Sequence, residues 1–197
     1  MTVTVIACGA LAPELRAVLA GIGDVDIRFL PANLHNRPDG IVPAVDAIVA
    51  GLAPDRLPPD SKVFLAYADC GTGGALDAYL AQHPGIGRLP GAHCYEFFAG
   101  SDRFAELHDA EPGTFYLTDF LAKHFEALVW EGLGLDRHPE LLPVYFGNYR
   151  RLVLLSQSDD HRVADAAKAA AAKLGLSFEH VPTGLGRFAS AVSIGVA

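Results

Sequence analysis

Basic residues are scarce and scattered in this sequence. Lys and Arg together number 15 of 197 residues, against 23 Asp and Glu, so the formal net charge is −8. Lys and Arg form no block anywhere along the chain. Nucleic acids and anionic membrane surfaces attract proteins through clustered positive charge. We therefore expect neither of them as a partner.

Long apolar runs are also missing. No uninterrupted apolar stretch reaches the roughly 18 residues that suggest a membrane-spanning helix. The first residues, 1–6, have no basic segment and resemble the start of a strand, so we expect no signal peptide. The default expectation that follows is a cytoplasmic protein.

Cysteine is rare, with three residues in the whole chain. An odd number of thiols in a reducing compartment argues against a disulfide framework. Internal repeats and low-complexity linkers are absent too. The apolar fraction of 51% is enough for a sizeable core, and the length fits one domain spanning residues 1–197.

Short apolar runs alternate with helical patterns along the chain. Strands are predicted at 2–7, 25–30, 63–66, 152–155 and 176–181, and helices at 13–20, 42–52, 75–82, 120–131 and 163–174, with a Pro-rich connector at 54–60. This alternation predicts an α/β fold, a mostly parallel sheet with helices on both faces in a three-layer sandwich. In such sheets, ligands bind outside the carboxyl ends of the strands.

The chain is organised around the stretch from Tyr67 to Gly74, which follows a buried strand and precedes a helix. Gly71, Thr72, Gly73 and Gly74 form a turn whose backbone N–H groups are expected to face a small anionic ligand or cofactor. The alternative is a tight connection between strand and helix. A thiol beside a helix start is expected to have a lowered pKa.

The three cysteines each follow a predicted strand or a turn at the same edge of the sheet. If Cys8, Cys70 and Cys94 meet there, they form a metal site whose ligands come from three separate segments. The alternative is that each is a small buried hydrophobic residue, which is the usual fate of a free cysteine.

Polar residues accompany the thiols and are the candidate catalytic groups. Asp69 precedes Cys70, while His93 and Glu96 flank Cys94. His93 is either a ligand or proton shuttle, or a structural histidine. His35 lies in a loop after the second strand, and surface exposure is the simpler interpretation for it.

Several of these segments are similar to an uncharacterised family of archaea and bacteria, a domain of unknown function. The matching pieces are Ala7-Cys8-Gly9, Asp69-Cys70-Gly71, His93-Cys94 to Gly100-Ser101, and 112–118. The resemblance implies that three thiols are the shared feature, encoded beside corrinoid-dependent methyltransferases and their corrinoid partners. In the family an Asp separates the His from the third Cys, whereas here His93 directly precedes Cys94.

Three thiolates suit zinc or a [4Fe-4S] cluster, because both prefer sulfur ligands. Either centre would keep one position open for a substrate. The sequence thus predicts a metal-binding enzyme or accessory protein of corrinoid-linked one-carbon metabolism, with a corrinoid protein or methyltransferase as a possible partner. The alternatives are a metal-free module that binds a small anion, and an interaction protein with structural cysteines.

Overall fold

The computed structural model describes residues 2–52 and 61–196. Contacts group the chain into two compact units. Unit 1 comprises Met1–Phe97 and Arg187–Ala197, and unit 2 comprises Phe98–Gly186. Unit 2 is therefore inserted into unit 1, and the chain passes between them twice.

Unit 1 is built on a four-stranded sheet in which every neighbouring pair is parallel. The strands are β1 (Val3–Cys8), β2 (Val25–Leu30), β3 (Lys62–Ala66) and β4 (Ile86–Arg88), in the order β2-β1-β3-β4. All six residues of β1 are buried, as the β-branched and apolar composition of this central strand requires.

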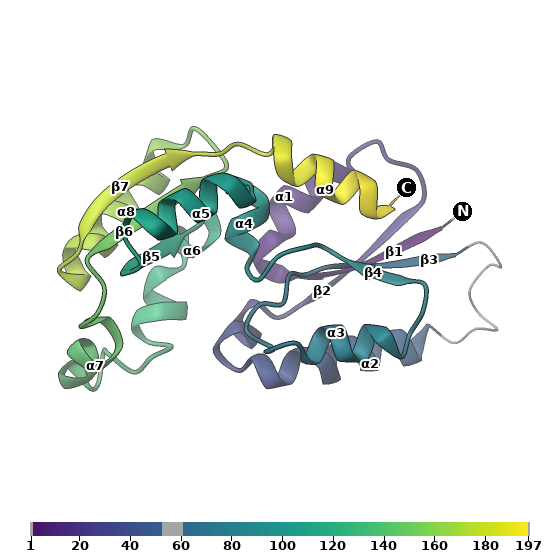
Figure 1. Ribbon diagram of the computed structural model, residues 1–197, viewed down its shortest axis with the longest axis horizontal. Coiled ribbons are helices and arrows are strands. Elements are labelled where there is room, and N and C mark those ends of the chain that lie inside the picture. Colours follow the sequence, from purple (N-terminus) through teal and green to yellow (C-terminus); the bar gives the residue numbers. More distant parts are fainter. Residues whose placement is uncertain (1, 53–60, 197) are drawn as a thin grey trace. The chain divides into compact units, whose positions relative to one another are not determined.

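Helices cover both faces of the unit 1 sheet (Figure 1). On one face lie α1 (Ala12–Leu19) and the C-terminal α9 (Gly186–Val196), and on the other lie α2 (Ile41–Gly51) and α3 (Ala75–Ala81). The short helix α4 (Cys94–Ala99) follows β4. Phe97 of α4 stacks on Phe188 of α9, with ring centroids 5.4 Å apart, which ties the C-terminal helix to the unit.

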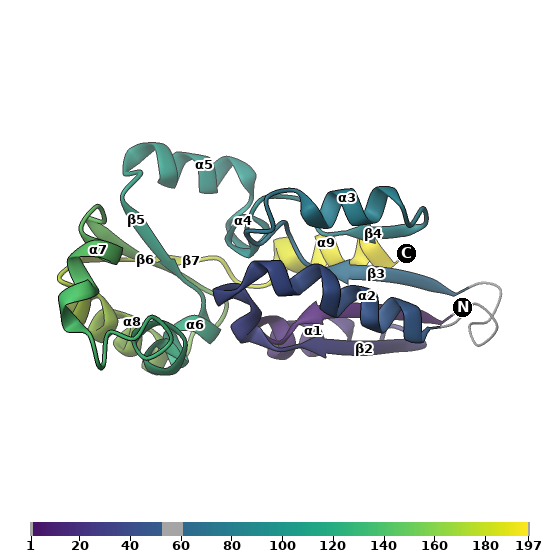
Figure 2. The same ribbon diagram turned by 90° about the horizontal axis from the view of Figure 1, so that it is seen from below.

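Unit 2 has its own three-stranded parallel sheet in the order β5-β6-β7. Its elements are α5 (Ser101–Ala110), β5 (Thr114–Leu117), α6 (Asp119–Lys123), the π-helical turn η4 (Glu126–Trp130), α7 (Leu142–Phe146), β6 (Arg151–Ser156), α8 (His161–Leu174) and β7 (Ser177–Pro182). Helix α5 lies on one side of this sheet, and α6 and α8 lie on the other (Figure 2).

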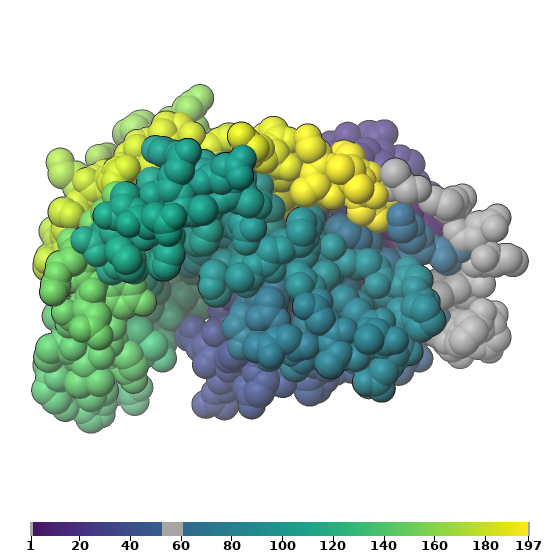
Figure 3. Space-filling model, in the orientation of Figure 1, coloured from purple at the N-terminus to yellow at the C-terminus, as the bar shows by residue number. Residues whose placement is uncertain are grey.

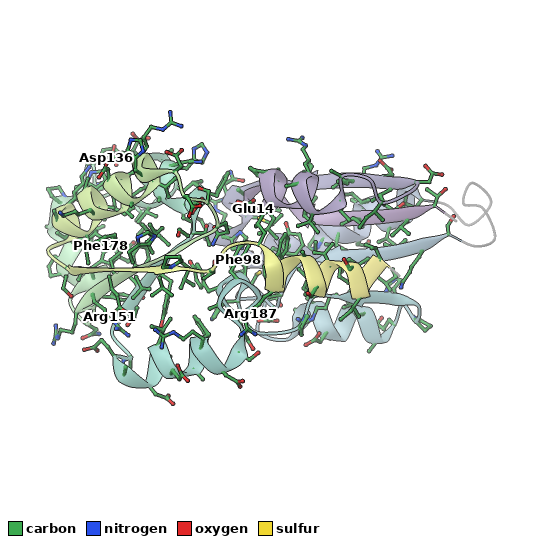
Figure 4. The ribbon with its side chains drawn as sticks, turned by 90° about the horizontal axis from the view of Figure 1, so that it is seen from above. Glu14, Phe98, Asp136, Arg151, Phe178 and Arg187 are labelled. Carbon is green, nitrogen blue, oxygen red and sulfur yellow. The ribbon has the colours of Figure 1, made fainter. Side chains whose placement is uncertain are left out.

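Two polar clusters fix the layers of unit 2. The half-buried Arg151, labelled in Figure 4, donates to Thr114 Oγ1 at 2.8 Å and to the Leu107 carbonyl at 2.5 Å, which joins β6 to β5 and to α5. At the carboxyl end of the sheet, the buried Asp119 accepts from the Gln157 amide at 3.0 Å and from Ser158 Oγ at 2.5 Å. Because these groups satisfy one another, both clusters are structural.

The predicted fold class is confirmed, because two parallel sheets are flanked by helices. The expectation of one sheet is wrong, since strands 3 to 88 and 114 to 182 form separate sheets. Helix α9 was missed because its weakly polar sequence has no cap or charged face. The predicted connector 54–60 lies outside the described residues. That the whole chain behaves as one domain stays a prediction.

Among the described residues, no helix combines the length and the apolar character needed to cross a membrane. The outer side of α9 can be followed in the space-filling view (Figure 3). Its Ile194 is 78% exposed, whereas Phe188 and Val192 of the same helix are fully buried. One face of α9 therefore belongs to the core of unit 1.

The packing of α9 on β3 gives a test of this arrangement. A Cβ atom at Gly195 would collide with the ring of Phe64, which is 3% exposed. We expect Gly195→Ala to destabilise the protein by about 1–3 kcal/mol through overpacking and to lower its melting temperature. Gly186→Ala in the same helix is the control, because nothing lies within 4 Å of the added atom. Equal melting temperatures for the two variants would contradict this packing.

Candidate metal centre

The order of the unit 1 strands locates the candidate site. From β1 the chain continues to β2 on one side, and it then returns to β3 on the other side of β1. Such a reversal opens a crevice at the carboxyl ends of the two central strands, where α/β proteins bind ligands. Cys8 is the last residue of β1, and Cys70 follows β3, so the two thiols flank this point.

The backbone at Cys70 adopts an unusual conformation. Its φ of +52° makes it the one non-glycine residue with a positive φ among the described residues. A side chain in this left-handed region costs conformational energy that the surroundings must offset. Such strain is typical of functional positions, where the direction of one side chain matters more than local stability.

Asp69 stabilises the turn that carries Cys70. Its carboxylate accepts from Thr72 Oγ1 at 2.5 Å, from the Gly73 amide at 3.0 Å and from the Gly74 amide at 2.9 Å. These bonds lower the pKa of Asp69, chiefly through the Thr72 hydroxyl, with further contributions from the Gly74 and Gly73 amides. The lowered pKa favours the ionised carboxylate, which supports the turn; a catalytic role for Asp69 stays a prediction.

The same turn was expected to cradle an anion with its backbone amides. The amides of Gly73 and Gly74 donate to the Asp69 carboxylate, and the Thr72 amide donates to the Asp69 carbonyl at 3.1 Å. Binding of a ligand by Gly71, Thr72, Gly73 and Gly74 stays a prediction.

Two main-chain hydrogen bonds bring the third thiol to the same place. The amides of Asp69 and Cys70 donate to the carbonyls of Gly91 and Ala92, at 3.1 and 2.9 Å. Since Cys94 follows Ala92 by two residues, this pairing holds the start of α4 beside the end of β3. The backbone of Cys94 also forms a hydrogen bond that lowers the pKa of the Cys70 thiol.

The three thiols lie within electrostatic range of one another. Cys8 raises the pKa of Cys70, and both Cys70 and Cys8 raise the pKa of Cys94. Burial is the largest cause in all three cases. The pKa of Cys8 rises to about 11 and that of Cys70 to about 12. The expectation of a lowered pKa at Cys70 is therefore wrong, because burial outweighs the position before a helix.

His35 is exposed, as its position in a loop predicts, and it also lies against this site. Its Nδ1 lies 3.6 Å from Cys8 Sγ and 3.2 Å from the carbonyl oxygen of Ala32. Because a carbonyl only accepts, Nδ1 carries the proton and Nε2 keeps a free lone pair. Loss of solvation lowers the pKa of His35, the hydrogen bond with the Ala32 carbonyl opposes this shift, and the nearby His93 lowers the pKa further. His35 is thus neutral at pH 7, as a metal-binding imidazole must be.

Tyr67 is the second residue that sequence reasoning missed. It is 1% exposed, and no described residue gives its hydroxyl a hydrogen-bond partner. Its ring stacks on that of His35, with centroids 6.5 Å apart and planes 15° from parallel. Burial, together with Cys8 and Cys70, raises the pKa of Tyr67. The sequence feature that could have indicated this residue is its position, directly after the apolar strand and at the edge of the sheet where ligands bind.

The remaining candidate catalytic residues have different surroundings. Glu96 accepts from the Ala92 amide at 3.1 Å, so its carboxylate holds the segment before Cys94. His93 is exposed and lies within electrostatic range of His35. A catalytic role for either residue stays a prediction.

The donors do not yet surround a single point. Within residues 2–52 and 61–196, no group of three or more His, Cys, Asp or Glu side chains is arranged to hold one metal ion. The donor types nevertheless suit a metal that prefers sulfur, since three thiols and a neutral imidazole lie at this edge of the sheet. Binding one ion would require the thiols to move closer together.

The hydrogen bonds of ionised Asp69 predict that the stability of the folded protein decreases in acid. Its lowered pKa means that ionised Asp69 stabilises the folded state at neutral pH, and this contribution is lost as the pH falls through the folded-state pKa. We expect Asp69→Asn to destabilise the protein by about 1 kcal/mol at pH 7 and much less near pH 3. Thermal unfolding across this range measures the difference, with the exposed Asp39→Asn as control. A constant deficit would contradict the role of its charge.

The buried thiols predict the opposite dependence at alkaline pH. A raised folded-state pKa favours the protonated thiol in the native state, so this stability is present below pH 8.5 and is lost as the pH rises towards 11–12. We expect the reduced, metal-free protein to lose stability more steeply above pH 9 than Cys70→Ala does. Parallel melting curves for the two proteins would show that Cys70 is not buried as a thiol.

The comparisons with known proteins identify a family and no activity. No curated protein and no solved structure matches the chain. A family model described as "Protein of unknown function (DUF1638)" matches residues 29–192, a range that includes Cys70 and Cys94 and begins after Cys8. Because this match covers most of the sequence, the chain belongs to the DUF1638 family.

Proposed function

We propose that this protein holds a metal centre on Cys8, Cys70 and Cys94, with one coordination position left for a substrate. The observation that carries the proposal is the placement of the buried Cys8 and Cys70 and the partly buried Cys94 within electrostatic range of one another at the carboxyl ends of β1 and β3, where main-chain hydrogen bonds hold the segment before Cys94. A structural role for the thiols requires neither this convergence nor the strained backbone of Cys70.

The electrostatics of the site favour the binding of a cation over three unpaired thiolates. Three adjacent buried thiolates would repel one another, and burial already keeps the thiols protonated at neutral pH. A bound cation reverses this balance, because it compensates the charge that burial makes unfavourable. Metal binding would then release protons from the cysteines.

Among the possible centres, a [4Fe-4S] cluster tolerates a wider spacing of the thiols than zinc does. Zinc needs all its ligands around one ion at about 2.3 Å, whereas a cluster spreads its thiolates over different irons. The described donors do not surround a single point. Zinc when bound would activate a substrate thiol as a methyl acceptor, and a cluster would transfer electrons or bind a small ligand at its free iron.

The residues around the thiols have separate tasks in this proposal. Asp69 and the Gly-rich turn fix the backbone that sets the direction of the Cys70 side chain. His93 is the candidate proton shuttle at the exposed side of the site, where it interacts with the neutral His35. An enzyme or accessory protein of corrinoid-linked methyl transfer fits such a centre, and this setting rests on the resemblance of the cysteine segments. A corrinoid protein or methyltransferase would be the partner.

The metal content of protein purified without oxygen tests the proposal. We expect about four irons with sulfide for a cluster, or about one zinc. Cys8→Ser, Cys70→Ser and Cys94→Ser should each lose the metal and keep their circular dichroism spectrum, because the cores of both units do not include the metal. The control His124→Ala, an exposed residue of unit 2, should keep it.

Two outcomes would overturn the proposal. Wild-type protein that contains no metal and takes up none from iron with sulfide, or from zinc, would favour an interaction protein with structural cysteines. Metal that survives in all three cysteine variants would place the centre elsewhere.

A further inference from the structure

The Tyr67 hydroxyl is a buried polar group whose partner is not explained by the surrounding chain. Its oxygen is inaccessible to solvent, and the described residues offer it no hydrogen bond. A buried hydroxyl without a partner costs free energy, so such groups are rare in native proteins. The hydroxyl therefore lacks a strong acceptor in this state of the site, in which the neighbouring Cys8 is a protonated thiol.

The reactive group nearest to the Tyr67 hydroxyl in this argument is the Cys8 thiol. The Ala10 amide donates to Cys8 Sγ at 3.4 Å, and His35 Nδ1 lies 3.6 Å from the same sulfur. Tyr67 stacks on His35 and interacts with Cys8, without meeting the geometry of a hydrogen bond. Three potential donors thus converge on one sulfur atom.

This convergence suits a thiolate better than a thiol. A thiol sulfur is a weak acceptor, whereas a thiolate accepts several strong hydrogen bonds. Donors directed at a metal-bound sulfur are the usual means by which proteins orient ligands and tune a metal centre.

We propose that Tyr67 is a positioning residue whose hydroxyl donates a hydrogen bond to Cys8 Sγ once Cys8 is a metal-bound thiolate. This inference rests on the proposed metal centre and adds a residue to it. It explains why a fully buried hydroxyl is kept at the end of β3, where Phe would fill the same space.

The proposal gives Tyr67→Phe opposite effects in two states of the protein. In the metal-free state the variant removes a buried hydroxyl whose neighbour is only a weakly accepting thiol, so the melting temperature should stay the same or rise. In the metal-bound state it removes a hydrogen bond to a ligand, so metal affinity should fall by about tenfold. A residue that only packs would not separate the two states in this way.

The experiment uses wild-type protein, Tyr67→Phe and a matched control, Tyr116→Phe, which removes a hydroxyl from a buried tyrosine of unit 2. All three are titrated with Co²⁺ without oxygen, and separate samples are reconstituted with iron and sulfide. We expect Tyr67→Phe to bind Co²⁺ more weakly and to shift the sulfur-to-cobalt charge-transfer band to longer wavelength. In the iron form its reduction potential should become more negative. Tyr116→Phe should match wild type in affinity, band position and potential.

The outcomes distinguish this inference from the metal centre itself. If wild type forms a centre and Tyr67→Phe matches it in affinity, band and potential, the role of Tyr67 is rejected and the centre stands. A clear loss of stability in metal-free Tyr67→Phe would also reject it, because the hydroxyl would then have a structural partner. If wild type forms no centre with either probe, both proposals fail.

Discussion

The candidate site depends on two main-chain hydrogen bonds between the end of β3 and the segment before α4. The amides of Asp69 and Cys70 donate to the carbonyls of Gly91 and Ala92. Without this pairing, nothing in the sheet would hold Cys94 next to Cys70, because β4 has already ended at Arg88. The left-handed backbone of Cys70 is energetically unfavourable. The ionised Asp69 offsets this conformational energy by accepting hydrogen bonds from three groups of the following turn.

Burial then gives the site its chemical character. The same packing that collects the thiols removes them from water and raises their pKa values. As thiols they are poor nucleophiles, so the arrangement is unfavourable for a cysteine that must react by itself. It is favourable for a cation that binds several sulfurs, because each thiolate it generates is stabilised by the metal charge. Tyr67 and His35 fit this view, since both present polar groups near Cys8.

Most individual elements were predictable from local sequence. The β-branched run that becomes β1, the Ala-rich α8 and the Gly175 that ends α8 match their predicted positions within one or two residues. The separation into two sheets was not predictable, because strand partners are chosen by tertiary packing and each strand carries only its own apolar pattern. Helix α9 shows the same limit. It is stabilised by contacts of Phe188 and Gly195 with unit 1 rather than by capping residues or helix propensity.

The site was predictable in part for similar reasons. The rule that ligands bind at strand ends located Cys8 and Cys70 correctly, since this depends only on the fold class. The environment of each side chain was not accessible in the same way. The carboxylate of Asp69 accepts hydrogen bonds from the turn that follows it, and the exposed His35 also lies against Cys8, and neither contact can be read from the sequence. Such roles depend on which hydrogen bonds form after folding.

The most direct test of the metal centre is a crystal structure of protein purified and crystallised without oxygen, with diffraction recorded at the iron and zinc absorption edges. A centre bound by Cys8, Cys70 and Cys94 predicts anomalous density among the three sulfurs: either one zinc about 2.3 Å from each sulfur, or a cluster in which each sulfur lies about 2.3 Å from its own iron. A metal peak elsewhere, or three thiols packed apart from one another with no peak between them, would contradict it.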